Sequence, residues 1–231
     1  MSKIKLDSRL SAVASLVRQG SVVADIGTDH AYLLCYLIEN GICPEGIAAD
    51  INKGPLNNAK QTVIDCGIND KVKLILSDGL KSIPENSADD IVMAGMGGIL
   101  ISEIIDCAPW VKNENINIIA QPMTHAEVLR EYLCKNGFKI NKEITATDGK
   151  RLYVVMSLSY SGLTYDYDKS YYYLGELLKN NDEITKKYIE KMISALQKKY
   201  IAQKKAQIEG SQELEKLIND IKKKFTEVYG I

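Results

Sequence analysis

The stretch Asp25-Ile-Gly-Thr-Asp-His-Ala-Tyr32 decides the fold, because it closes a short apolar run, Ser21 to Ala24, and opens an apolar helical pattern. This pattern predicts a strand, a tight turn and the start of a helix, as in the turn that binds dinucleotides. In that turn, glycine lets the backbone approach a pyrophosphate at the helix N-terminus. Here Asp29 follows Gly27 by two residues, and its carboxylate would repel a phosphate. The turn therefore favours a ligand with a cationic head, such as the sulfonium and ammonium groups of S-adenosylmethionine (SAM).

Short apolar runs recur as far as Ser161 with helical patterns between them, and this alternation predicts a parallel sheet with right-handed crossovers. The predicted strands span residues 21–25, 46–50, 72–77, 90–94, 116–120, 138–144 and 152–157. The connection between the last two contains the hairpin signal Asp148-Gly149. We therefore predict an α/β fold whose seven-stranded, Rossmann-like sheet ends in an antiparallel pair.

Several residues mark the ends of the intervening helices. Pro55 suits the first position of a helix, and Thr124-x-x-Glu127 has the pattern of a capping box. Gly67 and Gly137 are predicted to end their helices in the left-handed conformation.

The pattern changes after Ser161, where no further strand is predicted. Apolar residues recur there at helical spacing in two stripes, which are Ile184, Tyr188, Met192, Leu196 and Tyr200, and then Leu214, Leu217, Ile221, Phe225 and Val228. The turn residues 209–212 between them predict an antiparallel hairpin of the coiled-coil type. We expect a domain of residues 1–162 followed by a helical domain of residues 163–231.

The composition narrows the classes of protein. The formal net charge is −1, so binding to a nucleic acid would depend on local basic patches. No apolar run approaches the roughly 20 residues that span a bilayer, and the N-terminal segment lacks the apolar centre of a signal peptide. We expect a cytoplasmic protein that does not contact a membrane. The five cysteines show no paired spacing and His30 and His125 lie far apart, so no metal is expected.

Three acidic residues, Asp25, Asp50 and Asp78, end three successive predicted strands. The carboxyl ends of parallel strands meet at the edge of the sheet where open α/β folds bind ligands. Their joint placement indicates a binding site. An acid that ends a strand is also a common helix N-cap, and this alternative stays open for each of the three.

A seven-stranded sheet with a terminal hairpin is similar to that of class I SAM-dependent methyltransferases. In that class, the position of Asp50 holds both ribose hydroxyl groups and that of Asp78-Gly79 holds the adenine amino group. Asp25-x-Gly27 matches the first two elements of the class motif. Asp29 and Ala31 depart from its usual glycines.

The fourth predicted strand ends in Ala94-Gly-Met-Gly-Gly98. Enzymes that methylate exocyclic amino groups have an Asn/Asp-Pro-Pro-aromatic motif here, so its absence disfavours amino-directed chemistry. A glycine-rich loop would let the backbone approach a flat substrate closely. The alternative is that the glycines only permit a tight turn from strand to helix.

Five motifs together resemble the bacterial tRNA (adenine(22)-N(1))-methyltransferase family: Asp25-Ile-Gly-Thr-Asp-His-Ala-Tyr-Leu33, Gly54-Pro55, Asp78-Gly79-Leu80, Ala94-Gly-Met-Gly-Gly98 and Gln121-Pro122. The resemblance covers residues 1 to about 160 by motifs and the remainder by architecture only. It implies a SAM-binding domain followed by a helical coiled-coil domain. It also implies methylation of ring nitrogen 1 of adenine 22, in the D-arm region of tRNA.

Ring nitrogen 1 of adenine carries a free lone pair, so the reaction needs alignment of nitrogen, methyl and sulfur rather than a base. The predicted catalytic residues are Asp29, Met96 and Gln121. The predicted cofactor contacts are Asp25, Gly27, Thr28, Asp29, His30, Asp50, Asp78, Gly79, Ala94, Gly95, Met96 and Gly97. The predicted substrate contacts are Arg9, Tyr32, Gly98 and Pro122. For Arg9, a solvated position on the first helix is an equal alternative.

The helical region offers two features to an RNA partner. Lysines recur in pairs along one predicted helix, and tyrosines gather between residues 160 and 173. The lysines could follow a phosphate backbone or be a solvated face, and the tyrosines could stack on bases or pack a linker against the main domain. We expect tRNA as the partner and a monomer or weak homodimer. The alternatives are a methyltransferase for another RNA or a small molecule, and a non-catalytic RNA-binding protein with a SAM fold.

Overall fold

Seven strands form one mixed sheet in the computed structural model, which describes residues 4–230. Residues 1–3 and 231, at the outer ends of the two expected domains, lie outside the described residues. The strands are β1 (Val23–Ile26), β2 (Gly46–Asp50), β3 (Val72–Leu76), β4 (Asp90–Gly97), β5 (Asn117–Thr124), β6 (Phe138–Asp148) and β7 (Arg151–Tyr160). Their order is β3-β2-β1-β4-β5-β7-β6, and β7 runs antiparallel to β5 and β6. The predicted α/β fold with a terminal antiparallel pair is confirmed.

Helices cover both faces of this sheet. One face carries α1 (Ser8–Ala14), α2 (Tyr32–Glu39) and α3 (Lys53–Cys66), and the other carries α4 (Gly98–Asp106) and α5 (Ala126–Lys135). Successive residues of a strand point to opposite faces. In β4, Val92 packs with the first set of helices, whereas Ile91 and Met93 pack with the second. Because both faces are covered, the central strands are apolar on both sides.

Two strands are longer than the sequence pattern predicts. Pairing between β6 and β7 continues to Asp148 and Arg151, so a two-residue turn at Gly149 and Lys150 joins them. β4 continues past Ala94 to Gly97, with register shifts on both sides of Met96. The segment interpreted as a glycine-rich loop is therefore an irregular strand that leads directly into α4.

Two of the predicted helix starts are wrong in detail. The N-cap of α5 is His125, in the left-handed conformation with φ 55° and without a side-chain hydrogen bond to the helix backbone, so Thr124 and Glu127 form no capping box. Pro55 is the third residue of α3 and not the first. Gly67 and Gly137 have φ of 70° and 82°, as predicted for residues that end a helix.

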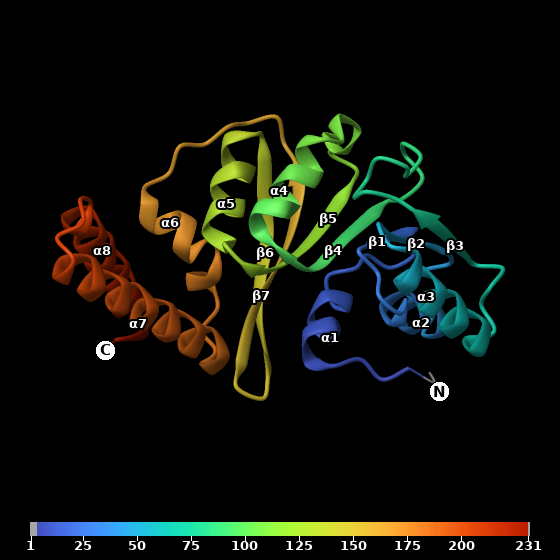
Figure 1. The fold of residues 1–231 in the computed structure, drawn as a ribbon, viewed down its shortest axis with the longest axis horizontal. Helices are drawn as coiled ribbons and strands as arrows, with labels where there is room; N and C mark the ends of the chain where they lie inside the picture. The colour runs from blue at the N-terminus through green and yellow to red at the C-terminus, as the bar shows by residue number, and fades with distance from the viewer. Residues whose placement is uncertain (1–3, 231) are drawn as a thin grey trace.

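The C-terminal region forms α6 (Lys169–Leu174), the short 3-10 turn η2 (Leu177–Lys179), α7 (Glu183–Lys205) and α8 (Ser211–Tyr229). A second 3-10 turn, η1 (Pro109–Val111), lies between α4 and β5. The segment 206–210 joins α7 to α8, and the two helices pack against each other. They lie at one end of the long axis of the molecule, and α2 and α3 lie at the other (Figure 1). The sequence did not predict α6 or η2, because elements this short have no measurable periodicity.

One apolar cluster runs without a break from the sheet into the helical region. It joins Leu129 of α5 and Val154 of β7 to Ile189 of α7 and Ile221 of α8. In α7 the buried residues are Thr185, Ile189, Ile193 and Leu196, so the first three lie one position after residues of the predicted stripe and only Leu196 belongs to it. Helix α7 is thus packed onto β6 and β7, and α8 packs in turn on α6 and α7.

A buried ion pair fixes the segment that leads to α7. Arg130 of α5 and Glu143 of β6 are each 1% exposed, and Arg130 Nε donates to Glu143 Oε1 at 2.8 Å. Arg130 Nη1 donates to the carbonyl oxygens of Tyr172 and Tyr173, both at 2.9 Å. Glu143 Oε2 accepts from the backbone N of Glu176. The pair therefore ties α5, β6 and the end of α6 together.

None of the helices within residues 4–230 combines the length and the apolar composition that crossing a membrane requires.

Candidate active site

The strand order reverses between β1 and β4, whose helices cover opposite faces of the sheet. In open α/β sheets, ligands bind in the crevice outside the carboxyl ends of the strands at such a switch point. Two cavities occupy this crevice, and both are lined by Gly27, Ala94 and Gly95.

The first, which we name the Arg9 cavity, has a volume of about 370 Å³. Its lining residues are Asp7, Arg9, Leu10, Asp25, Gly27, Thr28, Asp29, His30, Ala31, Tyr32, Leu33, Ala94 and Gly95. The end of β1, the turn after it and the start of α2 supply most of them, because Gly27 takes φ 77° and turns the chain sharply after the strand. Thr28 Oγ1 then accepts from the backbone N of Ala31 at 3.1 Å, which closes the turn.

Carboxylates dominate the charge of the Arg9 cavity. Asp7, Asp25 and Asp29 face one permanent cation, Arg9. Burial raises the pKa of the Asp25 carboxyl group to about 6, and nearby Asp50 adds to the rise, whereas Thr28 and Arg9 oppose it. A positively charged ligand would relieve this repulsion, as expected from the sequence.

A hydrogen-bonded group of three residues forms the wall of the Arg9 cavity beside β4. Gln121 of β5 is fully buried, and its Oε1 accepts from Arg9 Nη1 at 2.9 Å and from the backbone N of Gly95 at 3.0 Å. Gln121 Nε2 donates to the carbonyl oxygen of Pro122 at 3.2 Å. The bulge in β4 makes this possible, because it turns the Gly95 amide toward β5. Arg9 is therefore held in the site and is not a solvated helix residue.

The second, which we name the Asp50 cavity, has a volume of about 300 Å³. Its lining residues are Ile26, Gly27, Asp50, Ile51, Ser77, Asp78, Gly79, Ala94, Gly95, Met96, Leu100 and Ile104. Asp50 Oδ1 accepts from the backbone N of Asn52 at 2.7 Å, and no hydrogen bond within residues 4–230 engages Oδ2. Asp78 Oδ2 pairs with Lys81 Nζ at 2.5 Å on the exposed rim.

None of the three strand-end acids is a helix N-cap. Ala31 and Asn52 occupy the N-cap positions of α2 and α3. Asp78 is followed by turns. The alternative interpretation of these carboxylates is therefore wrong, and at least part of each one lines the crevice.

Two glycines of the crevice lie close against side chains. A Cβ atom on Gly27 would lie 2.3 Å from Met96 Cε, and one on Gly79 would lie 2.9 Å from Ile104 Cγ1. Both glycines have positive φ. Only glycine fits these two positions without displacing a side chain, so the crevice is a close-fitting cradle for an elongated ligand.

The structure brings most of the predicted site residues to this crevice, but four of them do not line its cavities. Gln121 is fully buried behind Arg9 and Gly95. Pro122 lines a different cavity, between β5 and α7. Gly98 lies beneath the β5–α5 connection, where an added Cβ would be 2.2 Å from the carbonyl oxygen of His125. Gly97 lies next to Thr124, where an added Cβ would be 3.3 Å from Oγ1. For Gly98, close packing from strand to helix accounts for the glycine.

Sequence reasoning missed several residues of the crevice. Asp7 lines the Arg9 cavity and caps α1 through a hydrogen bond to the backbone N of Leu10, at 2.6 Å. Ile51 is 59% exposed and adjoins Asp50, and Ser77 precedes Asp78. Ile51 and Ser77 could have been predicted from the sequence, because residues beside an acid at a strand end lie at the same edge of the sheet. Asp7 could not, because nothing in the sequence shows that α1 packs against this edge.

The arrangement can bind and orient an elongated, partly cationic ligand across the switch point. Asp50 offers a free acceptor oxygen on one side, and the Arg9 cavity offers carboxylates on the other. His30 and Tyr32 stack with ring centroids 5.0 Å apart and an interplanar angle of 7° at the open side. This pair forms a flat, partly exposed surface next to Asp29.

Comparison with known proteins agrees with this geometry. A family model described as a methyltransferase domain matches residues 6–156. The tRNA (adenine(22)-N(1))-methyltransferase of Bacillus subtilis is 37% identical over 156 residues, which is 68% of this chain and 66% of that protein. The chain thus spans about two thirds of that relative.

Solved structures match almost the whole chain. The tRNA methyltransferase TrmK of Bacillus subtilis is 29% identical, with a TM-score of 0.84 over 98% of this chain and 100% of that one. Sp1610 of Streptococcus pneumoniae, in complex with S-adenosyl-L-methionine, is 28% identical, with a TM-score of 0.83 over 96% of this chain and 100% of that one. The likeness therefore includes the C-terminal helices.

Proposed function

The chain belongs to the tRNA (adenine(22)-N(1))-methyltransferase family, and we propose that it transfers a methyl group from SAM to ring nitrogen 1 of adenine 22 in tRNA. The observation that carries this proposal is the pair of cavities that meet at Gly27, Ala94 and Gly95. One offers the Asp50 carboxylate and the other concentrates negative charge, which matches the ribose and the cationic end of SAM.

The cofactor contacts that we propose follow the two cavities. Asp50 would hold the ribose hydroxyl groups through its free oxygen, and Asp78, Gly79 and Ile51 would enclose the adenine ring. Further contacts come from the β1–α2 turn and β4 at Asp25, Gly27, Thr28, Asp29, His30, Ala94, Gly95, Met96 and Gly97. The close approach at Gly27 supports this fit, since a larger residue would displace Met96.

We propose that the protein acts on its substrate mainly by orientation. Nitrogen 1 of adenine has a free in-plane lone pair, so no residue needs to remove a proton before attack. When bound, the cofactor supplies the methyl group and retains the electron pair of the broken bond. Holding the two reacting atoms in line contributes about 7–11 kcal/mol to lowering the barrier in favourable cases.

Arg9 and Gln121 have different tasks in this proposal. The Oε1 atom of Gln121 is occupied by Arg9 and Gly95, and its Nε2 atom donates to Pro122. Gln121 is therefore a positioning residue, which fixes the Arg9 guanidinium at the edge of the cavity. Arg9 would contact the target base or its phosphate. Met96 would shape the passage between cofactor and base.

Asp29 is the proposed electrostatic group at the reacting centre. Its side chain is 72% exposed, and one oxygen lies 3.4 Å from His30 Nε2. Positive charge develops on the adenine as nitrogen 1 is methylated, so a carboxylate beside the exocyclic amino group would stabilise the transition state. Tyr32 and His30 would stack against the base, and Pro122, which lines the cavity between β5 and α7, would contact a neighbouring nucleotide.

We also propose the arrangement of the whole protein. Residues 1–162 would bind SAM and residues 163–231 would bind the tRNA outside its target base, as a monomer or weak homodimer in the cytoplasm. The exposed lysines of α7 and α8 support an RNA-binding role, and the five free cysteines suit a reducing compartment.

The proposed function is tested with unmodified tRNA transcripts and SAM carrying a labelled methyl group. We expect transfer to a transcript with adenine at position 22 and none to a transcript with guanine there. Methylated nitrogen 1 blocks base pairing, so primer extension should stop at position 22. Transfer that persists in the guanine transcript would assign another target base, and the absence of transfer to any transcript would contradict the proposal.

A further inference from the structure

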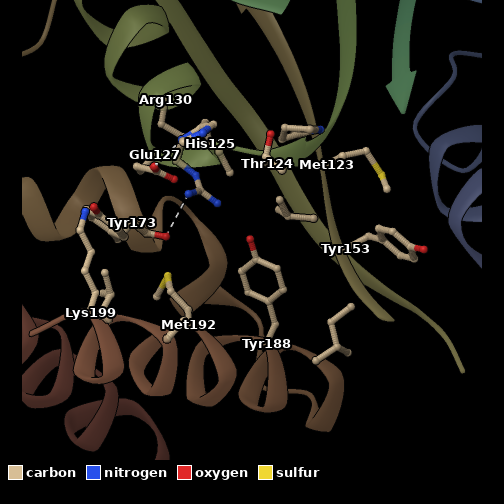
Figure 2. A pocket seen from close by; sticks show the side chains of 16 residues that line it. Met123, Thr124, His125, Glu127, Arg130, Tyr153, Tyr173, Tyr188, Met192 and Lys199 are labelled. Atoms are coloured by element: carbon tan, nitrogen blue, oxygen red, sulfur yellow. Dashed lines mark hydrogen bonds and ion pairs between the residues drawn. The ribbon is translucent and has the colours of Figure 1, made fainter. Parts of the chain in front are cut away.

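A third cavity lies between the methyltransferase sheet and the helical region, away from the crevice. It has a volume of about 330 Å³, and we name it the Arg130 cavity. The end of β5 and the start of α5 form one wall, β7 forms another, and Tyr188, Met192 and Lys199 of α7 close the third. Figure 2 shows Arg130 extending from α5 toward α7, with the side chains of Tyr188 and Met192 facing it.

The Arg130 guanidinium in this cavity keeps one donor without a partner. Nε and Nη1 are engaged by Glu143 and by the carbonyl oxygens of Tyr172 and Tyr173. Nη2 is buried and makes no hydrogen bond within the described part of the chain. An unpaired buried donor of a charged group costs free energy, so such a group is commonly the partner of a ligand.

The groups around Arg130 Nη2 are mainly hydrogen-bond donors and apolar side chains, which suit a bound anion. In Figure 2 the Tyr188 hydroxyl group points into the same space as the guanidinium, and Lys199 lies at the rim. Guanidinium, hydroxyl and ammonium donors together are typical of phosphate sites. Glu127 is the only acid that lines the cavity, and its Oε1 lies 3.3 Å from His125 Nδ1.

The cavity also lies next to the proposed substrate site along one strand. Gln121, which holds Arg9, is followed in β5 by Pro122, Met123 and Thr124, which line the Arg130 cavity. Three residues of extended strand cover about 10 Å. Arg9 and Arg130 belong to helices on opposite faces of the sheet, but this length of strand is short enough for neighbouring nucleotides of one RNA strand to reach both cavities around its edge.

We propose that the Arg130 cavity binds a backbone phosphate of the tRNA, at a nucleotide close to the target adenine. The Nη2 donor of Arg130 and the hydroxyl group of Tyr188 bind the phosphate oxygens, and Lys199 supplies charge at the rim. This inference rests on the proposed function, because it takes the tRNA as the ligand. A free anion of the same chemistry is the other source of such a group.

The test uses the full-length protein and variants that spare the buried ion pair. Arg130 itself is left unchanged, because its substitution would also remove the partner of Glu143. The variants are Tyr188→Phe, which removes only a hydroxyl group, and Lys199→Gln, which removes only a charge. Lys60→Gln is the matched control, since Lys60 is an exposed lysine of α3, outside the helices proposed to bind RNA, and lines neither this cavity nor the crevice.

The measurements are affinity for an unmodified tRNA transcript as a function of salt, affinity for SAM, and competition by inorganic phosphate. We expect Tyr188→Phe and Lys199→Gln each to raise the tRNA dissociation constant several-fold to about tenfold relative to Lys60→Gln, with SAM affinity unchanged. Lys199→Gln should also reduce the slope of log affinity against log salt by about 0.7–0.9, whereas Tyr188→Phe should leave the slope unchanged.

Three results would overturn the inference, and they differ from one another. If the protein methylates tRNA and both variants bind tRNA as the control does, the cavity is not an RNA subsite although the proposed function stands. If phosphate binds to the wild-type protein more tightly than to the variants while their tRNA affinities are equal, the site belongs to a free anion. If the wild-type protein neither binds nor methylates tRNA, the proposed function fails together with the subsite.

Discussion

Both the crevice at the switch point and the buried Arg130–Glu143 pair, which we call the junction, hold charged side chains away from water. They differ in whether those side chains have partners within the protein. In the crevice, Asp25 is buried beside other carboxylates and its pKa is raised to about 6. At the junction, nearly every polar atom of Arg130 and Glu143 has a partner within the protein. The first arrangement leaves charge for a ligand to neutralise, whereas the second holds two parts of the chain together. The one exception at the junction, Arg130 Nη2, is the atom that we assign to a ligand.

Removing one partner of the junction should have the largest effect on stability. Glu143→Ala leaves the buried guanidinium of Arg130 without its carboxylate, and breaking a buried pair in this way costs about 3–5 kcal/mol. Unfolding by urea, followed by circular dichroism, should show a free energy of unfolding that is lower by about this amount. The double variant Arg130→Met with Glu143→Leu is the control, because it removes both charges and should recover most of the loss. Equal stability of the single variant and the wild type would show that the junction does not hold the helical region.

Asp50→Ala should affect the crevice without affecting the fold. Loss of charge-assisted hydrogen bonds to the ribose would weaken SAM binding by about 1.5–3 kcal/mol, which is roughly 10- to 150-fold in the dissociation constant. Isothermal titration calorimetry measures the affinity, and the unfolding midpoint should stay close to that of the wild type. Asp65→Ala, on the exposed side of α3, is the matched control. SAM affinity equal to that of the control would remove Asp50 from the site.

The dependence of SAM binding on pH tests whether the Asp25 carboxylate in the crevice waits for a cationic ligand, in contrast to the paired charges of the junction. The raised pKa means that the folded protein holds the Asp25 proton between the ordinary value of 3.8 and about 6. A cationic ligand favours the carboxylate, so binding releases this proton, and the SAM dissociation constant should rise as the pH falls below 6, by up to about tenfold per pH unit.

The variant Asp25→Asn separates the two effects of this carboxylate. Its SAM affinity should be weaker and independent of pH between 4 and 7. Because stability falls as the pH rises through the window in which only the folded state is protonated, the variant should be more stable than the wild type above pH 6. A variant that keeps the pH dependence of the wild type would assign that dependence to another group.

The same contrast explains what the sequence could predict. The crevice was predictable because Asp25, Asp50 and Asp78 each end an apolar run, and parallel strands bring such ends together. The junction could not be predicted, because Arg130 lies in an ordinary amphipathic helix and Glu143 in an ordinary alternating strand. The pairing of these two residues depends on the position of α6. The extension of β4 to Gly97 was missed because Gly95, Met96 and Gly97 at its end are typical loop residues, whereas pairing with β5 keeps this segment in the sheet. Asp7 and Arg9 reach the crevice only through the tertiary placement of α1.

Asp168 gives the smallest expected effect and tests how firmly α6 and α8 are joined. It is the N-cap of α6, where Oδ1 accepts from the backbone N of Tyr171 at 3.0 Å, and it also pairs with Lys224 of α8 at 2.8 Å. Hydrogen bonds from Lys224 and Ser170 lower the pKa of Asp168 to about 2. Asp168→Ala should lower the free energy of unfolding by about 1 kcal/mol through loss of the cap. Lys224→Ala removes only the exposed ion pair, so it should cost less than about 1 kcal/mol.

The folded protein stabilises the charged form of Asp168, as its lowered pKa shows. The difference in unfolding free energy between Asp168→Ala and the wild type should therefore be complete above pH 4 and shrink as the pH falls toward 2. A difference that stays constant over this range would show that the helix cap does not depend on the charge of Asp168.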